Sequence, residues 1–429
     1  MKAATPKTGA ILPVYAGAVC AGVCAAICGA ICGALLLVVA CSKNASLGMA
    51  GSEDAGVDRI SYEKAEWDEF FQRNLQKASD IVRLMTDEQL AAQVIMAGID
   101  ACGPLSEGER KRLRRVPAGA IALFRKNLNA GSPAIIEMTE ELAALGPVLT
   151  MPDGTSGRRI KPFIAVDHEG GDVYRFNEAS VARLPAPLSY WELENGPAAL
   201  RAIEQDAAES AKEIAALGIT MNLAPLAETL TDENRDFLGT RSYGPDPDFT
   251  AKAAAAFIRG MKAASVSCVV KHFPGNAGVD PHIATPRLSG GEHELNAAIE
   301  PFAALIDGDP PSGVMVSHVI VPAWDSAQNA SLSEFVMQKK LRGELDFRGI
   351  IIADDFSMGA VSGGYDTEEK TVMALRAGAD MVMAWPRNLV SIHNAILAAL
   401  SDGSLPRERL QAAAARVISE KLRMESDTH

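Results

Sequence analysis

Two short stretches of the chain place residues capable of acid–base chemistry directly after apolar runs. The stretch KHFPGNAGVDPHIATPRL begins with Lys271 and His272 and then holds Asp280 and His282 two residues apart. A carboxylate beside an imidazole can orient the ring and raise its pKa, which suits a group that donates and accepts protons. The same composition is typical of an ordinary Gly/Pro turn, so these residues alone leave both interpretations open.

The second stretch is IIADDFSMGA, in which Asp354 follows three apolar positions typical of a strand. Asp354 is either the N-cap of a following helix or a carboxylate nucleophile at a strand end. Cleavage of a glycosidic bond commonly uses two groups, one nucleophilic or basic and one acidic. Asp354 together with the Asp280–His282 pair would supply both.

Two further stretches carry residues suited to holding a sugar. AVDHEGGDVYRF places Asp167 and Glu169 around a strand exit, followed by two glycines. It is either a glycine turn with solvated acids or a site where a carboxylate accepts hydrogen bonds from a polyol. NRDFLGTRSYGPDP contains Arg241, which is either a salt-bridged surface residue or a clamp on a sugar hydroxyl or an anion.

These residues must be positioned by a regular framework, and eight short apolar runs predict one. The runs are QVIMAG (93–98), AIALF (120–124), FIAVD (163–167), ITMNLAP (219–225), SCVVKHF (267–273), GVMVSHV (313–319), GIIIADD (349–355) and ADMVMAW (379–385). Between many of them lie Ala-rich amphipathic segments, such as residues 197–218 and 248–265, and TDEQ at 86–89 predicts a capping box. Continuous apolar strands alternating with helices predict an α/β fold, a (β/α)8 barrel, with a doubly wound sheet as the alternative.

Polar side chains end five of these runs. They are Asp167, Asn222, Lys271–His272, Ser317–His318 and Asp354–Asp355. In a parallel barrel the carboxyl ends of the strands meet on one face, which is the face that carries active sites. The sequence therefore predicts one site built from several distant segments.

The N-terminal segment differs in composition from the rest of the chain. No charged residue occurs between Lys7 and Lys43, and the apolar stretch is long enough to span a bilayer. LVVAC resembles the lipobox of bacterial lipoproteins, which predicts lipidation at Cys41, and an uncleaved anchor helix is the alternative. Either reading predicts a bacterial protein exported to the periplasmic or cell-surface side and tethered to a membrane. The expected domains are a signal or anchor segment (1–41), a flexible tether (42–58) and a catalytic domain (59–429).

Composition excludes several classes of function. A net charge of −13 and a pI near 5.1 argue against a nucleic-acid partner, since phosphate binding requires a basic surface. No nucleotide-binding or metal-binding signature occurs, so no cofactor and no metal are expected. Cys268 lies in an apolar run, which argues against a disulfide there.

Taken together, the motifs resemble glycoside hydrolase family 3, in particular its single-domain β-N-acetylglucosaminidases (β-N-acetylhexosaminidases). The resemblance covers residues 80–420 and rests on FIAVDHEGGDVYRF, MNLAPLAE, LGTRSYGPDP, KHFPG, DPH, LRGELDFRGIIIADDFSMGA and AGADMVM, in family order. It implies a (β/α)8 barrel and retaining hydrolysis without a metal or organic cofactor. By motif position it implies Asp354 as the nucleophile and His282 as the acid/base with Asp280 as its partner, and a sugar held by Asp167, Arg241, Lys271 and His272.

The function expected from this resemblance is removal of terminal β-linked N-acetylglucosamine, from peptidoglycan-derived muropeptides or related oligosaccharides, by a monomer. The alternatives are a sugar-binding lipoprotein with a degenerate barrel and a β-glucosidase-type enzyme of the same family. The chain departs from the family pattern at Asn276, where a His is usual, at Thr240, where an Asp is common, and at Asn329, where a Pro is common.

Overall fold

The computed structural model describes residues 71–149, 157–193, 196–280, 285–357 and 364–426 of the 429-residue chain. The chain divides into two units, residues 1–52 and 53–429, and the first lies wholly outside the described ranges. The expected signal or anchor segment, the tether and the lipidation site Cys41 therefore lie outside the described residues. Among the helices that are described, none is both long enough and apolar enough to cross a membrane.

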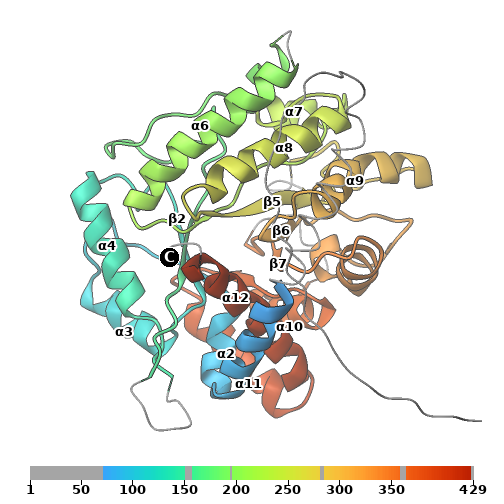
Figure 1. Ribbon diagram of the computed structural model, residues 1–429. Coiled ribbons are helices and arrows are strands. Elements are labelled where there is room, and N and C mark those ends of the chain that lie inside the picture. Colours follow the sequence, from blue (N-terminus) through green and yellow to red (C-terminus); the bar gives the residue numbers. More distant parts are fainter. Residues whose placement is uncertain (1–70, 150–156, 194–195, 281–284, 358–363, 427–429) are drawn as a thin grey trace, which may run out of the picture. The chain divides into compact units, whose positions relative to one another are not determined.

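Eight parallel strands form the centre of the second unit (Figure 1). They pair in the order β7-β6-β5-β4-β3-β2-β1-β8, and a bridge between Ile352 and Met381 closes the sheet between β7 and β8. The strands are β1 (Ile95–Gly98), β2 (Ala120–Leu123), β3 (Phe163–Val166), β4 (Met221–Asn222), β5 (Ser267–Phe273), β6 (Gly313–Val316), β7 (Ile350–Ala353) and β8 (Val382–Ala384). Each lies within one of the eight apolar runs, so the predicted (β/α)8 barrel is confirmed. The doubly wound alternative is wrong, because such a sheet would leave two open edges.

Apolar side chains fill the inside of the barrel. Alternate residues of a strand point to the same side of a sheet, and Ala120 with Ala122 and Ile350 with Ile352 belong to one interior cluster. Met315 and Met383, from β6 and β8, belong to the same cluster and also form part of the floor of a pocket. The barrel interior is therefore a packed core whose upper layer faces the candidate site.

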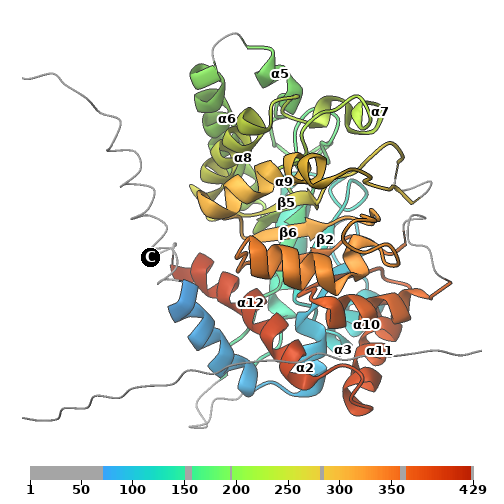
Figure 2. The ribbon, with the colours of Figure 1, turned by 90° about the vertical axis from the view of Figure 1, so that its right-hand side faces the viewer.

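Helices surround the strands, and Figure 2 shows α6, α8 and α9 packed along one side. The Ala-rich segments form α6 and α8, as predicted, and Gly260 lets these helices approach closely, because a Cβ there would lie 2.5 Å from the Glu204 carbonyl oxygen. The predicted capping box at Thr86–Gln89 is confirmed. The helical elements are α2 (Asp87–Gln93), α3 (Glu107–Arg115), α4 (Ser132–Ala144), α5 (Pro187–Trp191), α6 (Gly196–Ala216), α7 (Arg235–Leu238), η1 (Gly239–Arg241), α8 (Pro247–Lys262), α9 (Glu292–Asp307), η2 (Ala330–Leu332), η3 (Phe335–Glu344), α10 (Thr367–Ala377), α11 (Leu389–Ser401) and α12 (Arg407–Ser426).

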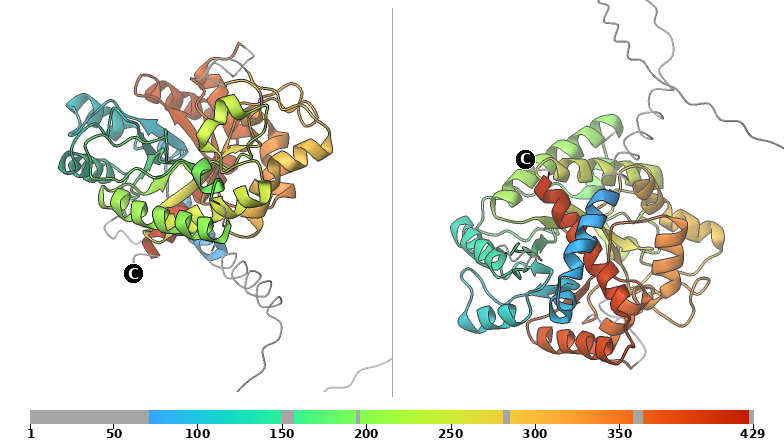
Figure 3. Two further views of the ribbon diagram at one scale, coloured as in Figure 1. Left: turned by 90° about the horizontal axis from the view of Figure 1, so that it is seen from above. Right: turned by 60° about the horizontal axis from the view of Figure 1, so that its bottom comes forward.

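The end of the barrel where the strands begin is covered by α12 and by the helical residues 71–83. Figure 3 shows these red and blue segments crossing over that end. Lys421 of α12 donates to Gln93, just before β1, and Ser267, the first residue of β5, donates to Glu420 of α12. Because this end is covered, the site must open at the opposite end, where the strands finish.

Candidate active site

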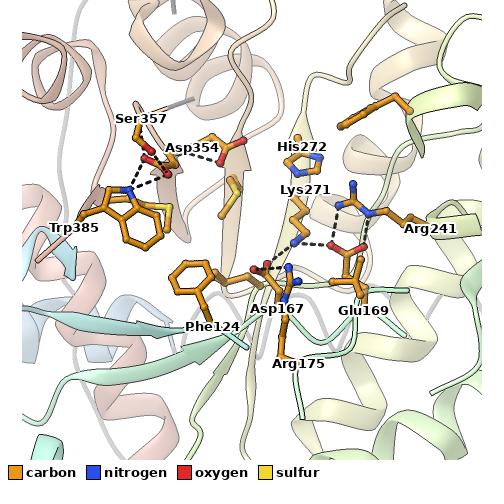
Figure 4. A pocket seen from close by; sticks show the side chains of 16 residues that line it. Phe124, Asp167, Glu169, Arg175, Arg241, Lys271, His272, Asp354, Ser357 and Trp385 are labelled. Atoms are coloured by element: carbon orange, nitrogen blue, oxygen red, sulfur yellow. Dashed lines mark hydrogen bonds and ion pairs between the residues drawn. The ribbon is translucent and has the colours of Figure 1, made fainter. Parts of the chain in front are cut away.

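A pocket of about 410 Å³ opens at the carboxyl ends of the strands (Figure 4). Side chains from the ends of β2, β3, β5, β7 and β8 contribute to it, as the strand-end pattern predicted. The lining residues are Phe124, Asp167, Glu169, Val173, Arg175, Leu223, Phe237, Arg241, Lys271, His272, Met315, Asp354, Asp355, Ser357, Met383 and Trp385. The four residues predicted to hold a sugar and the predicted nucleophile are thus brought together.

One half of the pocket is a network of ion pairs. Lys271 Nζ lies 2.7 Å from Asp167 Oδ1 and 2.7 Å from Glu169 Oε1. Arg241 donates through Nε and Nη2 to the two oxygens of Glu169, both at 2.8 Å. Such a fork fixes the plane of both groups, so the polar surface offered to a ligand is preorganised.

The charges of this network reinforce one another. Burial by itself raises the pKa of Glu169, but Lys271 and Arg241 outweigh it and hold that pKa far below its usual range. Burial likewise lowers the pKa of Lys271, and Asp167 and Glu169 reverse the shift to a net increase. Glu169 is therefore ionised and Lys271 is protonated at neutral pH.

Arg175 is a pocket residue that the sequence-based assignment did not include. Its Nη2 lies 3.5 Å from Asp167 Oδ2. Its Nε is buried and has no hydrogen-bond partner among the described residues. A buried donor without a partner is costly, and a hydroxyl of a bound ligand could satisfy it.

Asp354 stands across the pocket at the end of β7. Its Oδ1 accepts a hydrogen bond from the backbone N–H of Asp355 at 2.8 Å. Residues 355–357 are not helical, and α10 is capped by Asp366, so the N-cap reading of Asp354 gains no support from the described residues. Burial raises the pKa of Asp354, but His318, His272, the Asp355 N–H and Lys271 outweigh it and leave the pKa lowered. A carboxylate that stays ionised can act as a nucleophile.

An aromatic wall adjoins Asp354. Both carboxylate oxygens of Asp355 accept from Trp385 Nε1 at 3.0 Å, and the Ser357 hydroxyl donates to Asp355 at 2.6 Å. The Trp385 ring packs on Phe124 with centroids 4.9 Å apart. Asp355 therefore fixes the Trp385 ring in an apolar wall opposite the ion-pair network. Asp354 and Asp355, although adjacent in the chain, have different surroundings.

Two of the five polar strand ends, Asn222 and Ser317–His318, do not line the pocket. Asn222 is buried and bonds both the N–H and the C=O of His168. Ser317 donates to the Gly275 carbonyl, and His318 is buried between Ser331 and the Asp355 carbonyl. These side chains position the backbone of the loops, so a polar residue at a strand end does not by itself belong to the site.

Of the predicted acid/base pair, Asp280 and His282, only Asp280 lies among the described residues. Asp280 is partly exposed and is not among the residues that line the pocket. His282 lies outside the described residues. Its predicted role stays a prediction.

Sequence reasoning missed several of the lining residues, for different reasons. It considered only polar strand ends, although Phe124 and Trp385 also end apolar runs and could have been found by the same rule. Glu169 was noticed but not assigned, and Arg175 lies eight residues beyond Asp167 in an irregular loop. No spacing rule identifies that arginine.

Two of the departures from the family pattern now have structural partners. Asn276 donates to Glu228, and Asn329 donates to the His318 carbonyl at 2.5 Å. Thr240 is exposed.

Cys102 and Cys268, the two cysteines of the described residues, are both free, as the apolar setting of Cys268 predicted. In the described part of the chain no group of three or more His, Cys, Asp or Glu residues could hold a metal ion.

Comparison with known proteins identifies the family. Residues 85–420 match the family model of the glycosyl hydrolase family 3 N-terminal domain. The chain belongs to glycosyl hydrolase family 3. It is 36% identical over 295 residues to a beta-hexosaminidase of Idiomarina loihiensis, a match that covers 66% of this chain and 82% of that protein.

Solved structures agree with this assignment. A family 3 beta-N-acetylglucosaminidase from Paenibacillus is 29% identical with a TM-score of 0.72, and the match covers 80% of this chain and 63% of that chain. The chain thus spans less than two thirds of the Paenibacillus protein. NagZ from Neisseria gonorrhoeae, solved with N-trifluoroacetyl-D-glucosamine, is 29% identical with a TM-score of 0.62, covering 76% of this chain and 89% of that one. The expectation of a family 3 glycoside hydrolase related to beta-hexosaminidases is confirmed.

Proposed function

We propose that this family 3 enzyme is a retaining β-N-acetylglucosaminidase that removes terminal residues from peptidoglycan-derived muropeptides or related oligosaccharides. The observation that carries the proposal is the shared pocket of Asp354 and the Asp167–Lys271–Glu169–Arg241 network. The beta-hexosaminidase relatives support the sugar class.

The chemistry assigned to the site needs two groups. The Asp354 carboxylate attacks the anomeric carbon and forms a glycosyl ester, while His282, oriented by Asp280, donates a proton to the departing oxygen. A water molecule then attacks the ester, and His282 accepts its proton. The net product keeps the β configuration because the carbon is inverted twice.

The pocket suits a single terminal sugar. Asp167, Arg241, Lys271 and His272 form the polar half, which offers donors and acceptors to hydroxyl groups. The wall of Trp385 and Phe124 presents an apolar face against which a sugar ring or an acetamido methyl can pack.

The decisive experiment compares chromogenic β-N-acetylglucosaminide with the matched β-glucoside. We expect the wild type to prefer the first and Asp354→Asn to lose roughly 10³-fold or more in kcat. His282→Ala should lose little on good leaving groups and much on poor ones, because a good leaving group needs less general-acid help. Binding without turnover by the wild type would favour a sugar-binding protein, and preference for the glucoside would favour a β-glucosidase.

Export and tethering are part of the same proposal. The segment 1–41, the tether 42–58 and the lipidation site Cys41 would hold the catalytic domain at a bacterial membrane, outside the cytoplasm. Membrane fractionation of wild type and Cys41→Ala tests it. Release of the variant from the membrane is the expected result, and equal retention would point to an uncleaved anchor helix.

A further inference from the structure

A buried carboxylate outside the pocket is bonded to one of the sugar-facing residues. Glu228 follows β4, and its side chain is 2% exposed. It accepts hydrogen bonds from His272 Nδ1 at 2.7 Å and from the His272 backbone N–H at 3.3 Å, both at Oε1. His272 lines the pocket, whereas Glu228 does not.

Asn276 fixes the carboxylate in this position. Its backbone N–H donates to Glu228 Oε2 at 2.5 Å, and its Nδ2 donates to Oε1 at 3.2 Å. Four donors from two residues therefore converge on one buried carboxylate. Because a carboxylate without a proton only accepts hydrogen bonds, the arrangement places a proton on His272 Nδ1.

We infer that Glu228 is a positioning residue that sets the tautomer of His272 and directs its Nε2 toward the sugar. With Nδ1 bonded to Glu228, Nε2 is the remaining ring nitrogen, and in the neutral ring it carries the lone pair. His272 and Asp354 project into the same pocket (Figure 4). His272 thereby accepts a hydrogen bond from a sugar hydroxyl, a role that the opposite tautomer could not fill.

This inference rests on the proposed function for its kinetic consequence but not for its geometry. A purely structural Glu228 would satisfy buried donors without any effect on how His272 contributes to catalysis. A positioning Glu228 acts through His272, so its removal should cost little once His272 is gone. The two roles therefore differ in a double-mutant cycle.

The first test needs no variant of Glu228. Nitrogen-15 NMR of the wild-type histidines at about pH 9, above the ordinary pKa of histidine, reports which ring nitrogen carries the proton. His272→Gln assigns the signal. We expect the Nδ1-protonated form, and the Nε2-protonated form would overturn the inference even if Glu228 variants failed to fold.

The second test is the kinetic cycle on a chromogenic β-N-acetylglucosaminide. Glu228→Gln keeps the size of the side chain but loses its charge, and we expect kcat/KM to fall about ten- to a hundredfold, as for loss of a hydrogen bond to a charged group. In a His272→Ala background the same substitution should change kcat/KM by less than about threefold. Equal effects in both backgrounds would overturn the inference.

Two further variants calibrate the cycle. Asn276→Ala removes one donor to Glu228 but keeps the backbone N–H, so we expect a loss of about threefold. Glu233→Gln makes the same chemical change on an exposed carboxylate of the same loop and should leave kcat/KM unchanged. A wild type without turnover would contradict the proposed function but not this inference, because the NMR experiment determines the tautomer of His272 without any measurement of activity.

Discussion

The two ends of the barrel each hold three cationic side chains around buried carboxylates, but they use them differently. At the open end Lys271, Arg175 and Arg241 contact Asp167 and Glu169, which we call the mouth cluster. At the covered end Arg342, Arg409 and Arg416 contact Asp380, which we call the base cluster. Asp380 is fully buried and also accepts from the Ile351 N–H at 2.9 Å, at the seam between β7 and β8.

The arginines of the base cluster donate to backbone carbonyls as well as to Asp380. Arg342 bonds the Phe347 and Gly349 carbonyls, and Arg409 bonds those of Leu375 and Ala379. Those bonds join η3 and α12 to the closing strands. The base cluster therefore holds the fold together.

The mouth cluster instead lines a pocket of about 410 Å³, and the Nε of Arg175 has no hydrogen-bond partner in the part of the chain that the structure describes. The pKa values show the same contrast. Burial lowers the pKa of Arg342 to about 9, and the two neighbouring arginines of the cluster add to this shift against the opposing effect of Asp380. At the mouth, Glu169 raises the pKa of Arg241 despite burial. Charges that face open volume can bind a ligand, and charges bonded to backbone stabilise the protein.

The largest effect is expected from breaking the base cluster. Asp380→Asn leaves three arginines without a carboxylate, and removing one partner of a buried ion pair typically costs about 3–5 kcal/mol of unfolding free energy. Denaturant unfolding measures the loss, while kcat of the folded fraction should stay within about threefold of wild type. A variant that keeps its stability and loses its activity would reverse the assignment of the two ends.

The matched change at the mouth is Glu169→Gln. It removes the negative charge shared by Lys271 and Arg241 and replaces one accepting oxygen with an NH2 group. We therefore expect kcat/KM to fall at least about a hundredfold, because the remaining contacts are no longer charge-paired. Unfolding free energy should fall less than for Asp380→Asn, since water in the pocket can solvate the two cations. Measuring both kcat/KM and unfolding free energy for the two variants tests whether the mouth cluster serves binding and the base cluster serves stability. Equal losses of both quantities in the two variants would contradict that distinction.

Acid should weaken the base cluster in a defined pH range. Although burial raises the pKa of Asp380, the three arginines lower it below its ordinary value of 3.8. A lowered carboxyl pKa contributes stability above the unfolded-state value, and that stability is lost as the pH falls through and below it. Unfolding free energies measured from pH 7 down to about pH 3 should fall more steeply for wild type than for Asp380→Asn. Parallel curves would show that Asp380 is not linked to acid unfolding.

The smallest effect concerns Lys421, also at the covered end. Burial lowers its pKa to about 7 from 10.5, so the folded state binds its proton less tightly than the unfolded state. Stability should therefore rise as pH increases from about 7 toward 10, and Lys421→Met should flatten this rise and stabilise the protein by about 1 kcal/mol at pH 7. Lys161 is an exposed lysine that lines the same surface pocket as Lys421. Lys161→Met is therefore the control, and it should change neither the rise of stability with pH nor the stability at pH 7.

The strand-end pattern predicted the mouth cluster better than the base cluster. Asp167, Lys271 and Asp354 follow or end apolar runs, so a parallel sheet brings them together by its topology alone. Asp380 is the second residue of the eighth run, but its arginines come from η3 and α12, and no periodicity pairs those helices with one strand. Glu228 was also missed, because no spacing in the sequence indicates that it bonds His272, which lies 44 positions further along the chain.

The sequence by itself determined the barrel, its eight strands and the side chains that meet at the strand ends, because alternation of apolar runs and amphipathic helices fixes a local pattern. Only the tertiary structure decided which polar groups face the pocket and which form hydrogen bonds with the backbone of the loops. Asn222 and His318 end strands as Asp167 and Asp354 do, yet they bond loop backbone instead. That outcome depends on hydrogen-bond partners distant in the chain, which spacing along one segment does not encode.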